Sequence, residues 1–469
     1  DVIYLLMPDR FANGDSSNDI HSSVSEKTNR NDKDGRHGGD IKGIIDHLDY
    51  LEDLGVTTLW STPMLEDNAP EVSYHTYAQS NVYRIDPRYG TNEDYRYLAN
   101  ALHQRNMKLI MDYVTNHWGI EHWMIKDLPS SDWIHQFEKY TNTNHRKEIH
   151  SDPYATNIDR NELLQGWFVP SMADLNQSNH YLLKYLSQNA IWWIEFAQID
   201  GFRVDTYPYN NPKPMITWLE AIRKEYPNFN IVGEEWSDNP AIISYWQKGK
   251  VNHDGYVSYL PTLMDFPLQI SFAESLKDEF TWGKGFIKPY RTLASDFLYP
   301  NPYNLLIFPD NHDMARFYTQ VGNDLNLFKM GIIYYSTMRG IPQFYYGTEI
   351  LMNSDDNPGD HGLIRTEFPG GWSDHEKNAF TGKNLTTEEI ETQEFFREVL
   401  NWRKNNKVIH KGKLIQFAPK PREGIYSFFR ILEDKMVWVI FNRNNVKCST
   451  RTRNNNFIIY CSCFVSKFT

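Results

Sequence analysis

The sequence is poor in cysteine, and its few cysteines all lie close to the C-terminal end. They are Cys448, Cys461 and Cys463 in a chain of 469 residues. No two of them have the spacing of a zinc or redox motif, and Cys461 and Cys463 are too close together to indicate a structural disulfide framework. We therefore expect no thiol chemistry in the main body of the chain.

Long apolar runs and a surplus of basic residues are also missing. No stretch reaches the roughly 18 apolar residues that a membrane-spanning helix needs. The net charge is −12, from 60 acidic and 48 basic residues, whereas nucleic-acid binding requires a basic face. No basic-then-apolar leader precedes the opening "DVIYLL", and we expect that an upstream segment has been removed. The sequence thus predicts no membrane span and no nucleic-acid partner.

Aromatic residues, in contrast, are abundant. They make up 15% of the chain, with 29 Tyr, 26 Phe and 14 Trp. Large rings fill hydrophobic cores, and they also stack against flat, weakly polar ligands such as sugars. The excess is therefore consistent with a large core and with an aromatic binding cleft.

Four apolar runs end in clusters of polar side chains that could take part in catalysis. They cover residues 108–117, 199–205, 230–236 and 304–313. Apolar residues with helical spacing lie between them, as in Leu182 to Ala197. Apolar strands that alternate with helices indicate a covered parallel sheet, and polar clusters at several strand ends are typical of a TIM barrel. A doubly wound sheet is the alternative, but no run is followed by the G-x-G-x-x-G loop that it would favour.

We predict an α/β fold, a TIM (β/α)8 barrel with an inserted loop-rich domain after strand 3. Residues 1–117 form the first part of the barrel, 118–180 the insertion and 181–407 the second part. From residue 408 the helical pattern stops, and "GIYSFFRI" and "MVWVIFN" are typical of antiparallel strands. Residues 408–469 are therefore predicted to form a small C-terminal β-domain.

Arg203 and Asp205 stand out in the strand-like run "GFRVD" (201–205). Side chains two apart on a strand point the same way, so these two should lie side by side, with Phe202 and Val204 on the other face. A guanidinium beside an aspartate favours the ionised carboxylate, which a carboxylate nucleophile requires. A structural ion pair has the same pattern, so this segment alone leaves both interpretations open.

Several segments together resemble the α-amylase family of glycoside hydrolases. "DYVTNH" (112–117), "GFRVD", "GEEW" (233–236) and "FPDNHD" (308–313) are similar to its four signature regions, in the same order. "GVTTLWSTP", "YHTY" and "GIPQFYYGTE" resemble other recurrent segments of the family. "MADLN" (172–176) and "RTEFPGGW" (365–372) are similar to the neopullulanase and cyclomaltodextrinase branch.

The resemblance implies a role for each residue of the site. Asp205 is expected to be the nucleophile, Glu234 the acid/base and Asp313 the carboxylate that stabilises the transition state, with Glu235 pointing away. A retaining glycosidase needs one ionised and one protonated carboxyl group, which fits this assignment. Asp112 and Asn116 are expected to organise the site. The expected substrate-binding residues are His75, Tyr77, His117, Arg203, Trp236 and His312.

A second cluster of oxygen-bearing side chains lies near the N-terminus, in "FANGDSSND" (11–19) and "HGGD" (37–40). Oxygen ligands with a glycine turn suit a hard cation, although a solvated turn rich in Asn and Asp has the same composition. The resemblance implies a structural calcium ion and no organic cofactor. Its expected ligands are Asn13, Asp15, Asn18, Asp19, Gly38 and Asp40.

The expected function is hydrolysis of α-1,4-glucosidic bonds in starch-type glucans, pullulan or cyclomaltodextrins through a covalent glycosyl-aspartate. One alternative is a transglycosylase on the same substrates, left open by Pro208 and Tyr209 in the acceptor region, where many relatives have Lys-His. Another is a catalytically silent glucan-binding protein, although such proteins typically lose a catalytic acidic residue. Calcium use and family habit favour a periplasmic or extracellular location.

Overall fold

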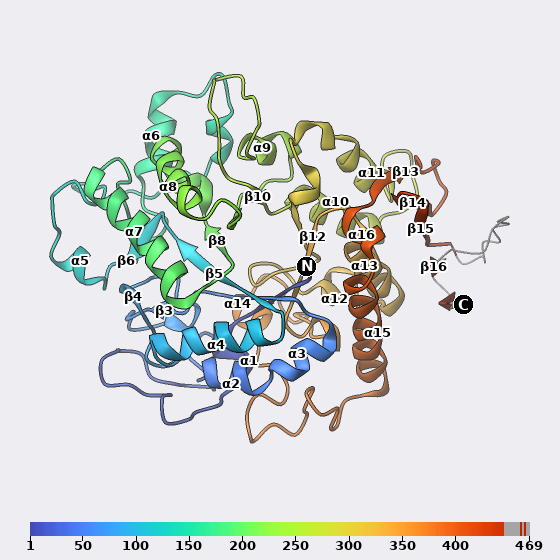
Figure 1. The fold of residues 1–469 in the computed structure, drawn as a ribbon, viewed down its shortest axis with the longest axis horizontal. Helices are drawn as coiled ribbons and strands as arrows, with labels where there is room; N and C mark the ends of the chain where they lie inside the picture. The colour runs from blue at the N-terminus through green and yellow to red at the C-terminus, as the bar shows by residue number, and fades with distance from the viewer. Residues whose placement is uncertain (445–459, 462–463, 466–469) are drawn as a thin grey trace.

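The protein is built around a barrel of eight parallel strands. The computed structural model describes residues 1–444, 460–461 and 464–465 (Figure 1). The strand order is β10-β9-β8-β5-β2-β1-β12-β11, and a parallel bridge between Met264 and Leu306 joins the two ends. This confirms the predicted TIM barrel. The strands are β1 (Ile3–Leu6), β2 (Thr58–Ser61), β5 (Lys108–Val114), β8 (Gly201–Asp205), β9 (Asn230–Gly233), β10 (Thr262–Leu263), β11 (Leu306–Ile307) and β12 (Ile341–Tyr345).

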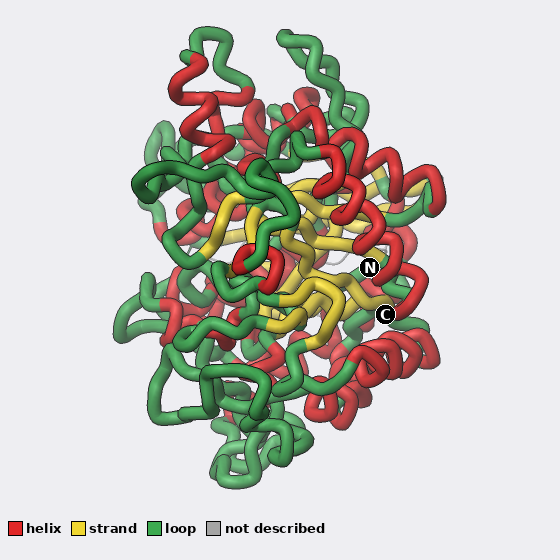
Figure 2. The backbone as a smooth tube through the Cα atoms, turned by 90° about the vertical axis from the view of Figure 1, so that its left-hand side faces the viewer, coloured by secondary structure: helices red, strands yellow, loops and turns green. Residues whose placement is uncertain are grey.

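Helices surround the strands, which lie at the centre of the molecule in Figure 2. The predicted helical periodicity over 182–197 corresponds to α7. The larger helices are α2 (Ile41–Asp46), α3 (Leu48–Leu54), α4 (Asn92–Gln104), α7 (His180–Ala197), α8 (Pro212–Glu225), α10 (Phe266–Lys277), α11 (Ile287–Ala294), α13 (Leu325–Thr337) and α15 (Thr387–Lys404). Short elements complete the barrel layer, namely α1 (Pro8–Phe11), η1 (Ser73–His75), η3 (Tyr207–Tyr209), α9 (Pro240–Tyr245), η4 (Asp296–Leu298), η5 (Pro302–Asn304), α12 (Phe317–Gln320), η6 (Thr348–Ile350) and α14 (His361–Ile364).

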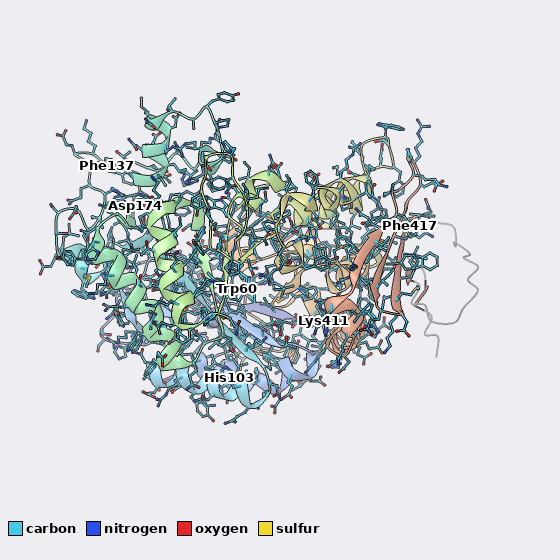
Figure 3. All side chains as sticks on the ribbon, turned by 45° about the horizontal axis from the view of Figure 1, so that its top comes forward. Trp60, His103, Phe137, Asp174, Lys411 and Phe417 are labelled. Atoms are coloured by element: carbon cyan, nitrogen blue, oxygen red, sulfur yellow. The ribbon has the colours of Figure 1, made fainter. Side chains whose placement is uncertain are left out.

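Strand β8 shows how the chain separates its core from its polar centre. Phe202 and Val204 are fully buried on one face, where the Phe202 ring packs 4.7 Å from that of Tyr113 and 5.0 Å from that of Phe229. Arg203 and Asp205 share the opposite face, as their alternation predicts. Figure 3 shows the side chains that fill the interior, with Trp60 of β2 near the middle. Apolar faces thus turn to the helices and charged faces to the barrel axis.

The apolar residues Ile44, Leu48 and Leu51 lie in two consecutive helices, α2 and α3. His47 ends α2 and begins α3, with φ −118° and ψ 16°. Gly55 ends α3 in the left-handed region at φ 97°, as expected of a glycine cap. A Cβ atom there would lie 2.9 Å from the backbone nitrogen of Asn401 in α15, so glycine is also needed for close packing.

The β5–α7 segment, which follows the third barrel strand, contains long loops and little regular structure. Its strands β6 (His117–Gly119) and β7 (Met172–Asp174) pair antiparallel at its base. Between them lie α5 (Trp123–Lys126), η2 (Lys147–His150) and α6 (Asn157–Gln165). A second antiparallel pair, β3 (Leu65–Glu66) and β4 (Asn81–Ile85), lies between β2 and α4.

A three-stranded antiparallel sheet follows the barrel, as predicted for the C-terminal part. It contains β13 (Lys413–Gln416), β14 (Ile425–Leu432) and β15 (Lys435–Asn442), after α16 (Lys407–Lys411). The buried Arg430 donates to the carbonyls of Thr337 and Met338 at 2.8 Å and so ties this sheet to the barrel. A short pair, β16 (Tyr460–Cys461) and β17 (Phe464–Val465), is also described, whereas Cys448 and Cys463 lie outside the described residues. No helix of the described part is long and apolar enough to cross a membrane.

Candidate active site

Arg203 lies at the centre of a group of three carboxyl groups from three neighbouring strands. Its Nη1 atom is 2.8 Å from Asp205 Oδ1 and 3.0 Å from Asp112 Oδ1, and its Nη2 atom is 2.6 Å from Glu234 Oε1. The arginine is 1% exposed. Because parallel strands end at one face of the barrel, side chains that are distant in sequence meet here.

Glu234 follows β9, and its backbone N–H donates to the Val204 carbonyl at 3.1 Å. Its Oε2 atom accepts from the Thr206 N–H at 3.1 Å. Burial raises the pKa of Glu234 to about 7, against the lowering effect of Arg203 and together with the negative charges of Asp205 and Asp313. This carboxyl group is therefore substantially protonated near neutral pH.

Asp313 lies after β11, where Arg365 and His312 contact its two oxygen atoms. Arg365 Nη2 donates to Oδ1 at 2.7 Å, and His312 Nε2 lies 3.2 Å from Oδ2. Burial raises the pKa of Asp313, but the positive charges of His312 and Arg365 outweigh it and hold this pKa well below its usual range. Since burial lowers the pKa of His312 to about 3, Arg365 supplies the positive charge near neutral pH. Asp313 is therefore ionised.

Asp112 lies behind these groups in a network of hydrogen bonds. Its Oδ2 atom accepts from Trp60 Nε1 at 3.1 Å and from the Tyr77 hydroxyl at 3.0 Å. The same hydroxyl is 2.7 Å from His312 Nε2, and the two rings are parallel with centroids 5.7 Å apart. Asp112 therefore holds the ring of Tyr77 in place, and Tyr77 in turn holds His312.

Two further histidines face the same space as neutral rings. Burial lowers the pKa of His75 to about 3 and that of His117 to about 4. The His117 ring stacks on Phe168, with centroids 5.5 Å apart, and its Nδ1 lies 3.3 Å from Asn116 Nδ2. Its buried Nε2 has no partner among the described residues. Such a ring nitrogen is available to a ligand hydroxyl.

A cleft of about 400 Å³ opens above these residues. All three predicted catalytic carboxyl groups line it, together with His75, Tyr77, His117 and Trp236. The predicted binding residues Arg203 and His312, and the organising residues Asp112 and Asn116, lie behind this lining. Trp236 is 38% exposed and stacks on Phe266 at the edge of the cleft. Pro208 and Tyr209, which the sequence analysis placed in the acceptor region, also line the cleft. So do residues that it did not assign to the site, namely Lys147, Phe168, Met172, Thr206, His361 and Arg365.

Glu235, the neighbour of Glu234, does not line this cleft. It is fully buried, and its Oε2 atom accepts from Trp246 Nε1 at 2.9 Å. Burial raises the pKa of Glu235 to about 8, against the lowering effect of Lys147. Glu235 therefore points away from the cleft, as expected from the alternation of side chains on a strand.

The N-terminal oxygen cluster is only partly assembled around a common point. Asn13 Nδ2 donates to Asp19 Oδ1 at 2.8 Å, and a Cβ atom on Gly38 would lie 2.7 Å from that oxygen. Burial raises the pKa of Asp19 to about 6, with a contribution from Asp40. Asn18 Oδ1 is buried without a partner in the described chain. These donors fit a hard cation.

Two observations limit the number of carboxylate ligands in this cluster. Asp15 is exposed, and its carboxylate accepts from Ser17 instead of turning toward Asp19. Asp40 caps α2 by accepting from the Gly43 N–H at 2.6 Å. Within the described residues no three His, Cys, Asp or Glu side chains converge on one point. Amide and backbone carbonyl oxygens would therefore have to supply much of the coordination.

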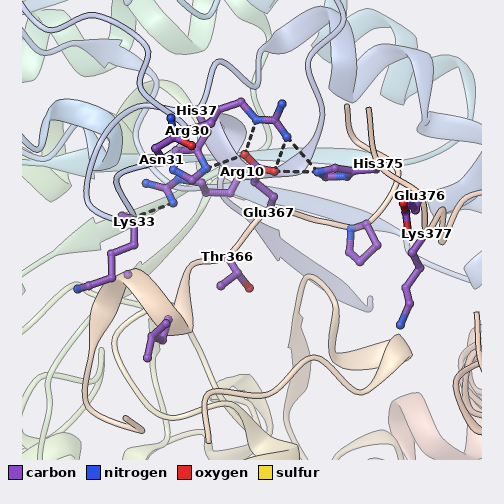
Figure 4. A pocket seen from close by; sticks show the side chains of 13 residues that line it. Arg10, Arg30, Asn31, Lys33, His37, Thr366, Glu367, His375, Glu376 and Lys377 are labelled. Carbon is purple, nitrogen blue, oxygen red and sulfur yellow. Dashed lines mark hydrogen bonds and ion pairs between the residues drawn. The ribbon is translucent and has the colours of Figure 1, made fainter. Parts of the chain in front are cut away.

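The "RTEFPGGW" segment is fixed to the N-terminal loop through Glu367, beside a second cavity (Figure 4). Arg30 donates to both oxygens of Glu367 at 2.8 Å, and His37 Nδ1 and His375 Nε2 each lie 2.8 Å from one of them. Although burial raises the pKa of Glu367, its hydrogen bonds to Arg30, His37 and His375 hold this pKa well below its usual range. Arg365, the partner of Asp313, begins this segment.

Taken together, a closed parallel barrel with buried carboxyl groups at the ends of its strands defines a TIM-barrel glycoside hydrolase. Residues 5–411 match the family described as the α-amylase catalytic domain, and residues 414–456 match the cyclomaltodextrinase C-terminal domain. The chain belongs to the α-amylase family and is an α-glucan hydrolase, which confirms the family predicted from the sequence.

Relatives in both sequence and structure agree with this assignment. Neopullulanase 2 of Thermoactinomyces vulgaris is 30% identical, over 95% of this chain and 70% of its own length. Cyclomaltodextrinase of Thermoanaerobacter pseudethanolicus is 26% identical, over 95% of this chain and 70% of its own length. The α-amylase of Geobacillus thermoleovorans, solved in complex with acarbose, superposes with a TM-score of 0.73 at 28% identity, over 93% of this chain and 85% of that one.

Proposed function

We propose that the protein cleaves α-1,4-glucosidic bonds with retention, through a covalent glycosyl ester on Asp205. The observation that carries this proposal is that Asp205, a Glu234 with its pKa raised to about 7 and an ionised Asp313 line one cleft. A retaining glycosidase needs one carboxyl group that donates a proton and a second that attacks the anomeric carbon.

Each residue then has a distinct task in the reaction. Glu234 protonates the departing oxygen, and its anion afterwards takes a proton from the water that releases the sugar. Asp205, 2.8 Å from Arg203, attacks the anomeric carbon. Asp313 is ionised and stabilises the positive charge that develops on the ring in the transition state.

The covalent step can be tested with an activated maltosyl donor that has a fluoride leaving group. In Glu234→Ala the ester should form, because fluoride needs little protonation, but its hydrolysis should be slow. Mass spectrometry should then find a glycosyl group on the peptide that contains Asp205. A labelled peptide without Asp205, or inversion at the anomeric carbon of the wild-type product, would overturn this proposal.

We further propose starch-type glucans, pullulan and cyclomaltodextrins as the substrates, because relatives of this chain bear the names neopullulanase, maltogenic amylase and cyclomaltodextrinase. Reducing-end release should be measured on β-cyclomaltodextrin, pullulan and soluble starch at equal mass. The first two should be cleaved at least as fast as starch. Cleavage of starch alone would instead assign the specificity of an ordinary α-amylase.

Transfer of the sugar to a second sugar is the competing outcome. The aromatic lining favours it, because Phe168, Tyr209 and Trp236 offer rings on which an acceptor sugar can stack. Chromatography of the products of maltotriose should show chains longer than the substrate if transfer competes with hydrolysis. Products no longer than the substrate would identify a strict hydrolase.

We also propose that calcium binds at the N-terminal cluster and stabilises the fold. The support is the unpartnered Asn18 Oδ1, the crowded Asp19 carboxylate and the close approach allowed by Gly38. The residues that would hold the ion are Asn13, Asn18, Asp19 and Gly38, with the Asp15 carboxylate turned away and the Asp40 carboxylate engaged by backbone N–H groups.

A further inference from the structure

Lys147 is a cleft residue that the proposed reaction does not use. It begins η2 in the β5–α7 segment, and its side chain is 14% exposed. Its ammonium lies 6.0 Å from the centre of the Tyr209 ring and 4.0 Å from Glu235 Oε1. Among the described residues it donates no hydrogen bond, so its donors remain available in the cleft.

The position of Lys147 is set by His150, which lies on the same short helix. The His150 ring nitrogen Nε2 donates to the Pro208 carbonyl at 2.6 Å, and the ring packs edge-on against Trp246 with centroids 4.8 Å apart. Trp246 in turn donates to Glu235. The Trp246 indole therefore contacts both η2, which carries Lys147, and the carboxyl group of Glu235, which faces Lys147.

Glu235 has one oxygen atom without a hydrogen bond. Oε1 is fully buried and unpartnered in the described chain, and it is the oxygen nearest to the Lys147 ammonium. A buried carboxylate is unfavourable unless a cation or a donor lies close to it. The Lys147 ammonium is attracted to this unpartnered oxygen, most strongly when Glu235 is ionised, and this attraction holds the ammonium against the cleft wall next to Glu234.

From this geometry we infer that Lys147 binds a hydroxyl group of the sugar on the leaving-group side, and that Glu235 is its positioning residue. The inference rests on the proposed function, since the departing sugar must lie beside the acid that protonates it. Trp236 and Tyr209 line the same part of the cleft and can stack on that sugar. An ammonium provides three donors for its hydroxyl groups.

The same contact would act on an incoming sugar. By microscopic reversibility, the site that the leaving group vacates is the site that a transfer acceptor must occupy. Lys147 therefore influences both the cleavage of oligosaccharides and the partition between water and sugar acceptors.

The test compares two donors in Lys147→Met, which keeps the chain length and removes the charge. Maltotetraose places a sugar on the leaving-group side, whereas α-maltosyl fluoride places only fluoride there. We expect kcat/KM for maltotetraose to fall about tenfold to a hundredfold relative to that for the fluoride, and transfer to added glucose to fall with it. Lys139→Met, an exposed change in the same segment, is the matched control and should leave the ratio unaltered.

Glu235→Gln tests the positioning role above pH 8, where Glu235 is ionised, because glutamine can still accept from Trp246 but carries no charge. It should raise KM for maltotetraose more than it lowers kcat, and it should add little to Lys147→Met in the double variant. Lys147→Arg, which restores the charge, should recover part of the loss.

Three outcomes would overturn the inference. An equal loss on both donors would mean that Lys147 only supports the fold, and no loss on maltotetraose would mean that it does not contact the sugar. A wild-type chain that cleaves neither donor would overturn the proposed function, and this inference with it. The inference alone fails if the wild type is active but Lys147→Met leaves unchanged the ratio of kcat/KM for maltotetraose to kcat/KM for the fluoride.

Discussion

Glu234 and Asp313 are both buried carboxyl groups, yet their neighbours move their pKa values in opposite directions. Burial and two nearby carboxylates raise the pKa of Glu234 to about 7, although Arg203 opposes this. Asp313 accepts from Arg365 and lies beside His312, which more than offsets its burial. Because their charged partners differ, Glu234 can act as an acid while Asp313 stays an anion in the same cleft.

Loss of the Glu234 carboxyl group should have a large effect on catalysis. We expect Glu234→Gln to lower kcat for maltotetraose about 10²–10⁴-fold, since general acid catalysis contributes that much. The loss with α-maltosyl fluoride should be smaller for formation of the ester. Glu235→Gln is the adjacent control, and a larger loss in it than in Glu234→Gln would reassign the acid.

The raised pKa of Glu234 also predicts the pH profile. The protonated form is required for cleavage, so kcat/KM for maltotetraose should fall as the pH rises through about 7. Initial rates between pH 5 and 9, at constant ionic strength, check this. If kcat/KM stayed flat across that range, Glu234 would not be the group that titrates.

Much of the site could be predicted at the residue level, because signature segments and strand alternation together identify side chains that share one face. Arg203 and Asp205 are an example, two positions apart in sequence and 2.8 Å apart in space. Lys147 and Arg365 were not assigned to the site, since only the folded chain brings their loops to the cleft. The start of "RTEFPGGW" was the one available signal for Arg365.

Glu367 joins two loops that are far apart in the sequence, and this contact should contribute to stability. Glu367→Gln removes the charge that Arg30, His37 and His375 share. We expect the free energy of unfolding to fall by about 1–3 kcal/mol, as for a partly buried donor left without its partner. Urea denaturation followed by fluorescence measures this.

The control for Glu367→Gln is Glu376→Gln, an exposed change in the same loop. It should alter the urea midpoint very little. Equal midpoints for the two variants would show that the Glu367 contacts contribute nothing measurable.

At the level of elements, the helix α7 was predicted from its apolar spacing, whereas the break between α2 and α3 was not. His47 interrupts the helix without proline or glycine, so no residue preference marks the position. The short η2 helix was missed for a related reason. It has a single turn, and packing of His150 against Trp246 fixes it rather than any local pattern.

The whole molecule offers a test of the calcium proposal. A chelator such as EGTA should lower the melting temperature by about 2–4 °C, and added calcium should restore it, because a ligand that binds only the folded state stabilises it. Asp19→Asn should abolish this response. Asp15→Asn should keep it, since the Asp15 carboxylate faces Ser17. A chelator response that is equal in all three proteins would place the ion elsewhere.

The barrel as a whole could be predicted, because four of its strand-like runs end in polar clusters and the segment over 182–197 has helical periodicity between them. The relative arrangement of the β13–β15 sheet and the barrel could not. It depends on single long-range contacts such as that of Arg430 with Met338. Such contacts leave no regular pattern in the sequence.

The pairing of β1 with β12 has a consequence for how the chain is made. Ile3 lies opposite Gln343, so the barrel cannot close until the ribosome has added the roughly 340 residues that separate these two strands. Until then the edge of β1 and its apolar neighbours are exposed during synthesis, and slow, long-range closure of this kind favours aggregation. Supplying a chaperone that shields nascent strands should therefore raise the yield of folded enzyme.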